Sequence, residues 1–395
     1  WVLANITLNK RGNNMEYAIL RVIWWVLVAV LMIGLMIMDG HDMGVGTLSP
    51  FVGKTDSERR AAINSVAPHW DGNQVWFITG GGAVFAAWPL VYAASFSMLY
   101  IAILAVLWTM FLRAPAFDYR SKIENPKWRA TWDWVLFVGS AVPPLLFGVA
   151  VGNVMLGIPF HFDDSMRLTS DASNPLFGFL GLLSPFALLC GLVSFCMTAA
   201  HGGVYLSIRT EGAMQARAKK AAAIFSILAI VLFAVGGLMV GHINGYVATN
   251  LDPNAASDPL MKTVEVVKGA WLNNYKLYPI TMLVPALGFI GLLFSLIFNI
   301  KGKSGLAFIF SGIGIAGIIL TSGVSMFPFI MPSSSDPISS LTAFDATSSE
   351  HTLLLMLVAA LIFTPIILTY TSWVYKIMRG KLTTARIEEN SHTMY

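Results

Sequence analysis

Long apolar stretches separated by shorter polar segments dominate the chain from residue 17 to residue 376. A membrane-spanning helix needs about 20 consecutive, mostly apolar residues, and eight stretches contain a charge-free core of that kind. They lie near 17–38, 75–112, 134–160, 178–208, 221–246, 277–300, 304–331 and 352–376. The pattern therefore predicts an all-α integral membrane protein with about eight transmembrane helices.

The second stretch, 75–112, is too long for a single span. A continuous helix of that length would measure about 57 Å, whereas the hydrocarbon core of a bilayer is about 30 Å thick. The stretch contains glycines at 80–82 and then Trp88-Pro89. Because proline breaks a helix interior, we expect a re-entrant or in-plane helix near 75–88, followed by a true span over 90–112.

Composition narrows the class of protein. Hydrophobic residues make up 56% of the chain and charged residues 12%, whereas an ordinary soluble domain is about 25% charged. This excludes a soluble enzyme and a disordered chain. The net charge of +4 is small, and no basic run alternates with aromatic residues, so we expect no nucleic-acid partner. Cys190 and Cys196 face different sides of one predicted helix, and the sequence predicts neither a disulfide nor a metal site.

Lysine and arginine alternate in density between successive predicted loops. Assigning all 25 in order places 18 on the side that includes both termini and 7 on the other side. The positive-inside rule then puts both termini in the cytoplasm. The first loop, 39–74, weakens the contrast because it carries Lys54, Arg59 and Arg60 on the less positive side.

The N-terminal residues 1–14 are polar and show no helical period, whereas Met15 is followed at once by an apolar pattern. We interpret residues 1–14 as an extension that precedes the natural start at Met15.

Ionisable residues concentrate directly after the first predicted span. Asp39 and Asp42 lie three positions apart in the stretch 39–46 (DGHDMGVG), so they share one face if the helix continues for another turn. Ionisable side chains inside a membrane are costly and are candidates for function. The alternative is a polar helix end at the membrane interface, which needs no function.

A second polar cluster, 64–76 (NSVAPHWDGNQVW), leads into the next apolar helix. Asp71 or Asn73 would suit the N-cap of that helix. With His69 and neighbouring amides, Asp71 would also suit a proton relay or the edge of a quinone site. Asp39, Asp42, His69 and Asp71 are therefore candidates for a proton path.

Two other histidines are weaker candidates. His201 and His242 lie in or at the end of apolar spans, where an imidazole serves either as a haem ligand or as a hydrogen-bonded interfacial group. No nucleotide-binding, zinc or Ser-His-Asp signature is present, so the chain itself has no predicted catalytic residue. These features fit a proton-coupled transporter as well as a respiratory subunit.

Several ordered motifs resemble one family. Besides 39–46 and 64–76, they are 117–124 (FDYRSKIE), 132–134 (WDW), 152–160 (GNVMLGIPF), 326–334 (MFPFIMPSS) and 345–349 (DATSS). From Met15 to Tyr395 the chain closely resembles subunit II of the cytochrome bd-type quinol oxidases. The family pattern usually carries phenylalanine where this chain has His41.

The resemblance implies a complex in the bacterial inner membrane that oxidises ubiquinol or menaquinol and reduces O₂ to water. Such a complex builds a proton gradient without pumping. Haem b and haem d would belong to the partner, subunit I. Small single-span accessory subunits, quinone and lipid are further implied partners.

For this chain, the resemblance implies two four-helix bundles, which we place at 15–209 and 210–395, the second with a cytoplasmic tail. Subunit II would support assembly of the haem sites, hold a structural quinone and help to line a proton path. Asp39 and Asp71 match family residues implicated in that path. The alternatives are a proton-coupled transporter of another class and a purely structural subunit in which these two aspartates conduct no protons.

Overall fold

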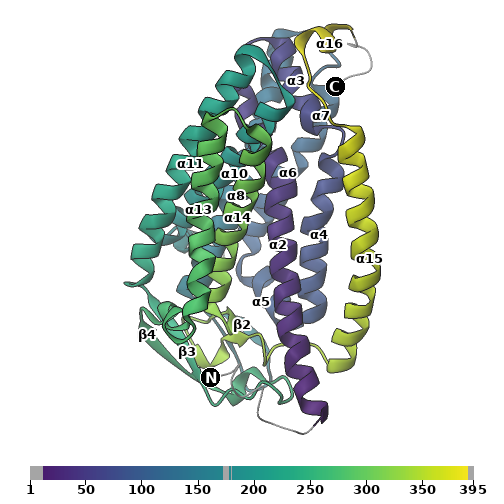
Figure 1. Cartoon of the computed structure of the whole chain (residues 1–395). Coiled ribbons are helices and arrows are strands. Elements are labelled where there is room, and N and C mark those ends of the chain that lie inside the picture. The colour runs from purple at the N-terminus through teal and green to yellow at the C-terminus, as the bar shows by residue number, and fades with distance from the viewer. Residues whose placement is uncertain (1–11, 172–177, 179, 390–395) are drawn as a thin grey trace.

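The computed structural model describes residues 12–171, 178 and 180–389, and its long helices run side by side (Figure 1). Within the described residues, eight helices are long and apolar enough to cross a membrane. The prediction of an all-α membrane protein with about eight spans is confirmed. The division into two four-helix bundles stays a prediction, and residues 1–11 of the proposed N-terminal extension lie outside the described part.

The helices and strands follow one another with short connections. The helices are α2 (Gly12–Val52), α3 (Asp56–Val66), α4 (Trp70–Ala87), α5 (Pro89–Met98), α6 (Tyr100–Phe111), α7 (Arg113–Tyr119), α8 (Pro126–Leu156), α10 (Pro185–Arg209), α11 (Gly212–Val240), α12 (Asn273–Leu277), α13 (Leu283–Ile300), α14 (Ser304–Met326), α15 (Glu350–Ile377) and α16 (Thr384–Glu389). The strands are β1 (Phe160–Phe162), β2 (Leu168–Ser170), β3 (Asn244–Thr249), β4 (Thr263–Lys268), β5 (Phe329–Met331) and β6 (Leu341–Thr342).

The first helix is much longer than predicted. Helix α2 contains 41 residues and would measure about 60 Å, so Asp39 and Asp42 lie within it and do not end it. The helix continues through Gly40, Gly44 and Gly46. Gly44 and Gly46 allow close packing against neighbouring helices. A β-carbon on Gly46 would lie within 3 Å of Ser140 of α8.

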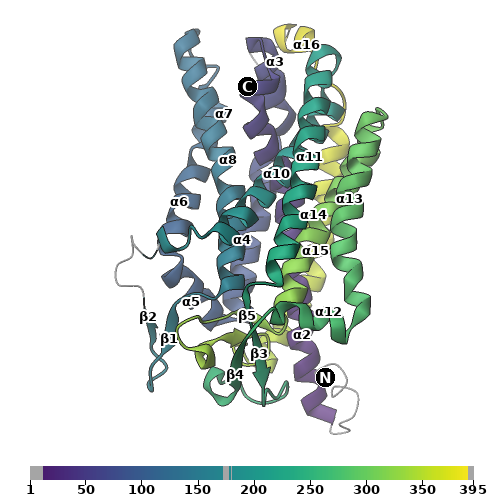
Figure 2. The same ribbon diagram turned by 90° about the vertical axis from the view of Figure 1, so that its left-hand side faces the viewer.

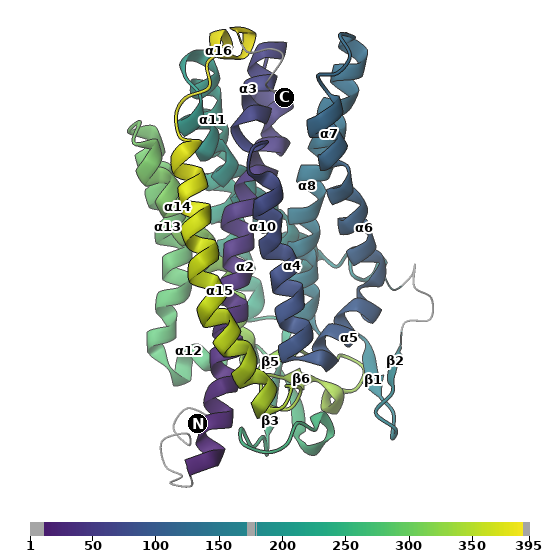
Figure 3. The ribbon, with the colours of Figure 1, turned by 90° about the vertical axis from the view of Figure 1, so that its right-hand side faces the viewer.

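Helix α4 differs from the expected re-entrant or in-plane helix near 75–88. It begins at Trp70 and runs antiparallel to α2, with Gly34 facing the ring of Trp76 and Gly80 facing Met32. Figure 3 shows α4 standing lengthwise beside α2 and α15. The predicted break at Trp88-Pro89 is confirmed, because Pro89 is the first residue of α5.

The bundle has two distinct ends. We call one the hairpin end, because strands β1 to β6 lie there, and the other the α3 end, which carries α3, α7 and α16 (Figures 1 and 2). Helix α2 starts at the hairpin end, whereas α16 lies at the α3 end. The expectation of both termini on one side is therefore wrong for the described chain, because α4 adds a lengthwise pass that the sequence analysis had not counted.

Lysine and arginine remain concentrated at one end of the bundle when α4 is counted as a pass. Eighteen Lys and Arg residues lie in the segments that form or approach the α3 end: Lys54, Arg59, Arg60, Arg113, Arg120, Lys122, Lys127, Arg129, Arg209, Arg217, Lys219, Lys220, Lys301, Lys303, Lys376, Arg379, Lys381 and Arg386. Only five of the described ones belong to the hairpin end: Arg21, Arg167, Lys262, Lys268 and Lys276.

Buried ion pairs hold both ends together. At the α3 end, Asp133 of α8 pairs with Arg120 at 2.5 Å and with Arg59 at 2.9 Å. At the hairpin end, Lys262 lies 2.9 Å from Asp345. Burial lowers the pKa of Lys262, although the carboxylate of Asp345 opposes that shift. These pairs give the motifs at 117–124, 132–134 and 345–349 a structural role.

Within the described residues, the hairpin end contains three small antiparallel sheets, which the apolar pattern does not predict. Strand β5 lies inside the stretch 304–331 that was expected to be helical. The longest hairpin pairs β3 with β4, with Tyr246 opposite Val266. Arg21 of α2 is fully buried here and donates hydrogen bonds to Thr347 at 2.8 Å and to the carbonyl of Pro253 at 2.7 Å. The motif that precedes α15 is thus anchored to the first helix.

Helix α10 is the most buried of the eight apolar helices, and it packs against α2 through facing glycines. A β-carbon on Gly202 would lie within 3 Å of the backbone of Gly44, and the reverse also holds. Small residues at such crossings let two backbones approach in a membrane.

We expect Gly202→Ala to destabilise the protein by about 1–3 kcal/mol, because the added methyl group overpacks the crossing of α2 and α10. Gly82→Ala is the matched control, since a β-carbon there meets no atom within 4 Å. The measurements are the yield and the thermal midpoint of the purified protein. Equal losses in both variants would contradict the role of this crossing.

Candidate functional site

Asp39 forms a buried ion pair with Arg113. Two contacts join them, from Nη2 to Oδ1 at 2.7 Å and from Nη1 to Oδ2 at 3.1 Å. Both side chains are fully buried. Arg113 opens α7, so this pair attaches the α6–α7 segment to the interior of α2. A charge without a partner would be very costly at this place.

Asp42 lies in a different environment, between two imidazoles. Its Oδ1 is 3.2 Å from Nε2 of His41 and 3.6 Å from Nδ1 of His69. Its Oδ2 accepts a hydrogen bond from the side-chain amide of Asn73 at 2.7 Å. Among the described residues, no lysine or arginine lies within ion-pair distance of Asp42, so the two imidazoles are the cationisable groups in contact with its carboxylate. We call His41, Asp42, His69 and Asn73 the histidine cluster.

Tyrosines close the histidine cluster from two further helices. The ring of Tyr205 of α10 packs against His41 at a tilt of 42°, with ring centroids 4.3 Å apart, and its hydroxyl lies 3.0 Å from Nε2 of His69. Tyr375 of α15 places its hydroxyl 2.7 Å from the amide of Asn73. The cluster therefore joins four segments of the chain and is shielded from solvent.

The predicted site residues are only partly brought together. Asp42 and His69 meet, whereas Asp39 is engaged with Arg113. Asp71 is exposed in the first turn of α4, and its side chain is not part of the cluster. The predicted caps are wrong, because the N-cap position of α4 is His69, which makes no side-chain capping bond.

The sequence does not single out four contributors. Arg113 follows a predicted span, Tyr205 and Tyr375 lie within predicted spans without a signal of their own, and His41 stands out only as a departure from the family pattern. Of these, His41 carried a usable signal, since it is a titratable residue between two aspartates.

His201 is buried beside the cluster, but both of its ring nitrogens are engaged. Nδ1 lies 2.6 Å from the Ser311 hydroxyl, and Nε2 lies 3.1 Å from the carbonyl of Ile37. His242 is exposed at the end of α11 and bonds to the carbonyl of Leu238. For both histidines, these hydrogen bonds favour the role of a hydrogen-bonded group over that of a haem ligand.

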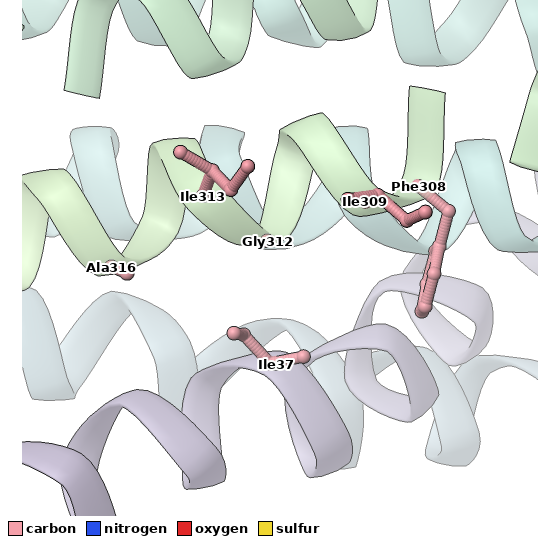
Figure 4. A pocket seen from close by; sticks show the side chains of 6 residues that line it. All are labelled: Ile37, Phe308, Ile309, Gly312, Ile313 and Ala316. Carbon is pink, nitrogen blue, oxygen red and sulfur yellow. The ribbon is translucent and has the colours of Figure 1, made fainter. Parts of the chain in front are cut away.

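An apolar groove of about 300 Å³ lies between α2 and α14 (Figure 4). It is lined by Ile37, Phe308, Ile309, Gly312, Ile313 and Ala316. Because all six lining residues are apolar, the groove suits a hydrocarbon chain rather than a polar head group.

Fold and site define a polytopic membrane protein with ionisable groups enclosed in its helix bundle. The family model described as cytochrome bd terminal oxidase subunit II matches residues 20–378. The chain belongs to this family, and the resemblance inferred from the motifs is confirmed. The membership removes the alternative of a transporter of another class.

Two curated relatives cover 96% of this chain and 100% of their own length. "Probable cytochrome oxidase subunit 2" of Haemophilus influenzae is 49% identical over 381 residues. "Cytochrome bd-I ubiquinol oxidase subunit 2" of Escherichia coli K12 is 49% identical over 382 residues.

The fold is also found in a solved structure, that of bd oxidase from Geobacillus thermodenitrificans. It matches with a TM-score of 0.67 at 13% identity and covers 91% of this chain and 98% of that chain. Family and fold together make this chain a multi-pass protein of the bacterial inner membrane, and a subunit of an oxidoreductase complex whose haem-carrying partner is subunit I.

We expect Asp39→Asn to reduce the yield of the assembled complex, because it leaves Arg113 buried without its counter-charge. Breaking such a pair costs about 3–5 kcal/mol, whereas replacing both partners by apolar residues is often neutral. The double variant Asp39→Leu with Arg113→Met should therefore recover much of the lost yield.

The matched control is Asp171→Asn, which breaks an exposed pair with His161 and should cost less than about 1 kcal/mol. Yield is measured from haem absorbance after purification. An Asp39→Asn complex with the yield and thermal midpoint of the parent would contradict a structural role for this pair.

Proposed function

We propose that this chain is subunit II of a quinol oxidase that oxidises ubiquinol or menaquinol, reduces O₂ to water and is electrogenic without pumping protons. The observation that carries this proposal is the match over 96% of the chain to a relative named as a ubiquinol oxidase subunit. Haem b and haem d would lie in subunit I, and this chain would support their assembly without supplying a ligand. The engagement of both nitrogens of His201 supports that part of the proposal.

The histidine cluster is proposed as part of a proton path. Reduction of O₂ to water consumes protons, which must pass through a medium of low dielectric constant. Asp42, His41 and His69 are titratable groups whose facing atoms lie 3.2 and 3.6 Å apart, and networks of closely spaced titratable groups can carry protons. Asp71 is exposed two residues after His69 and would serve as the point of uptake. Asp39 would act by holding α2 and α7 in place.

Quinone and lipid are proposed to contact the outer surface. The apolar groove between α2 and α14 would receive the isoprenoid tail of a structural quinone or an acyl chain of a lipid. Helix α15 is the least buried of the eight apolar helices, so its outer face would suit a single-span accessory subunit or lipid. A charged substitution on that face would be costly if it meets lipid.

We expect Asp42→Asn to lower quinol-dependent O₂ consumption by at least about tenfold, because the amide keeps the shape of the carboxylate but cannot accept a proton. General acid–base groups typically contribute about 10²–10⁴-fold to a rate. The assay uses the purified complex, whose parent form must consume O₂ with quinol and show haem b and haem d bands.

Asp71→Asn should give a smaller loss, and Asp118→Asn is the control, since Asp118 is exposed on α7. Haem content must stay equal in all variants. If Asp42→Asn turned over within twofold of the parent, the cluster would have no part in proton transfer.

We expect the α3 end to face the cytoplasm, because it carries most of the described lysines and arginines. Reporter fusions after Arg120, Arg217, Lys303 and Lys381 should therefore indicate cytoplasm, as should a fusion after Lys54. Fusions after Arg167 and Asp258 should indicate the outer side. The fusion after Lys54 is decisive, because the eight-span topology without α4 placed it outside.

A further inference from the structure

We propose that His41, Asp42 and His69 form a buried binding site for a zinc ion, with the hydroxyl of Tyr375 as the fourth ligand. The three residues each offer one ligand atom, and these atoms lie within 4.8 Å of one another. They come from α2 and from the connection between α3 and α4, while Tyr375 comes from α15.

The distances between the ligand atoms fit tetrahedral coordination. Zinc binds imidazole nitrogen and carboxylate oxygen at about 2.0–2.2 Å, so two ligands of a tetrahedral ion lie about 3.3–3.6 Å apart. Oδ1 of Asp42 is 3.2 Å from Nε2 of His41 and 3.6 Å from Nδ1 of His69. The hydroxyl of Tyr375 is 3.3 Å from the first nitrogen and 3.4 Å from the second. Four of the six edges of the tetrahedron are therefore close to the required length.

Hydrogen bonds outside the site orient both imidazoles. Nδ1 of His41 lies 2.9 Å from the carbonyl of Ile37, and Nε2 of His69 lies 3.2 Å from the carbonyl of Ser65. A carbonyl accepts only from an N–H, so these contacts assign the proton of each neutral ring to the outward nitrogen. The inward nitrogens then direct their lone pairs at Asp42. A ligating histidine whose other nitrogen donates to a carbonyl is the usual arrangement around a metal.

A hydrogen bond from outside the site also orients the carboxylate of Asp42. Asn73 donates to Oδ2 of Asp42 at 2.7 Å, whereas Oδ1 is buried without a hydrogen-bond partner. Three inward acceptors thus face one another around Oδ1. The amide of Asn73 lies 3.2 Å from Nδ1 of His69, and the hydroxyl of Tyr375 lies 3.3 Å from Nε2 of His41. These neutral donors leave Oδ1 without a partner, whereas a divalent cation would engage all three acceptors at once and balance the charge of Asp42.

The donor set narrows the kind of cation. Two imidazole nitrogens with oxygen ligands suit first-row transition metals, whereas calcium and magnesium prefer shells made of oxygen. Zinc is the one proposed here because four ligands at these distances fit its tetrahedral coordination. An ion here would clamp α15 to α2 and to the start of α4. The same atoms are those proposed above to exchange protons, but zinc binding does not depend on that function, and the test reads metal content rather than turnover.

The test measures zinc in the purified complex. The complex is incubated with Zn²⁺, treated with a chelator and passed through gel filtration, and zinc is counted by mass spectrometry against haem. We expect about one zinc per complex for the parent and at least about tenfold less for His41→Phe, which keeps an aromatic ring against Tyr205. His201→Gln is the matched control, because it removes a neighbouring buried imidazole that is not among the ligands, and it should retain the zinc of the parent.

Two further measurements keep the proposal falsifiable. X-ray absorption at the zinc edge should show a shell of about four nitrogen and oxygen ligands without sulfur. Asp42→Asn replaces His41→Phe if the latter does not assemble, and it should lose zinc as well. A parent complex that retains no zinc, or a ligand variant that retains as much as the parent, would overturn the proposal.

Discussion

The structure depends on the cost of keeping carboxylates inside a helix bundle that excludes water. Asp39 and Asp42 lie on one long helix and are both fully buried, yet they are accommodated differently. Arg113 neutralises Asp39 permanently through two contacts. Asp42 faces imidazoles that can gain or lose a proton, so its charge can change while its neighbours stay in place. One aspartate is thus suited to holding helices together, and the other to exchanging a cation.

The need to enclose two buried carboxylates explains why α2 continues as one helix through Gly44 and Gly46. Gly44 and Gly46 bring α10 and α8 close to α2, and the two aspartates on the same helix are fully buried. Helix α4 then supplies Asn73 from the opposite side. The polar centre is therefore enclosed by small residues on one face and by an amide and two tyrosines on the others.

The sequence was sufficient for the long helices, because an apolar run of 20 residues has few alternatives in a membrane. The break at Trp88-Pro89 was predictable for the same local reason. The continuation of α2 to Val52 was not, since the glycines and charges at 39–46 are unfavourable locally and are stabilised only by packing against distant helices. Asp71 looked equivalent to Asp42 in sequence, and only the rotation of α4 separates them. Tyr375 could not be found, because a single tyrosine in an apolar helix gives no periodic signal.

The order in which the cluster is completed follows from its positions in the chain. Arg113 is made 74 residues after Asp39, and Tyr375 follows His41 by 334 residues. During synthesis from the N-terminus, the first helix therefore leaves the ribosome with Asp39 lacking Arg113 and with Asp42 in contact only with His41 of the same helix. The last long helix is the one that closes the site. The polar centre therefore stays incomplete during biogenesis until the chain is nearly finished. Stable insertion of the first helix should then depend on the insertion of the last long helix.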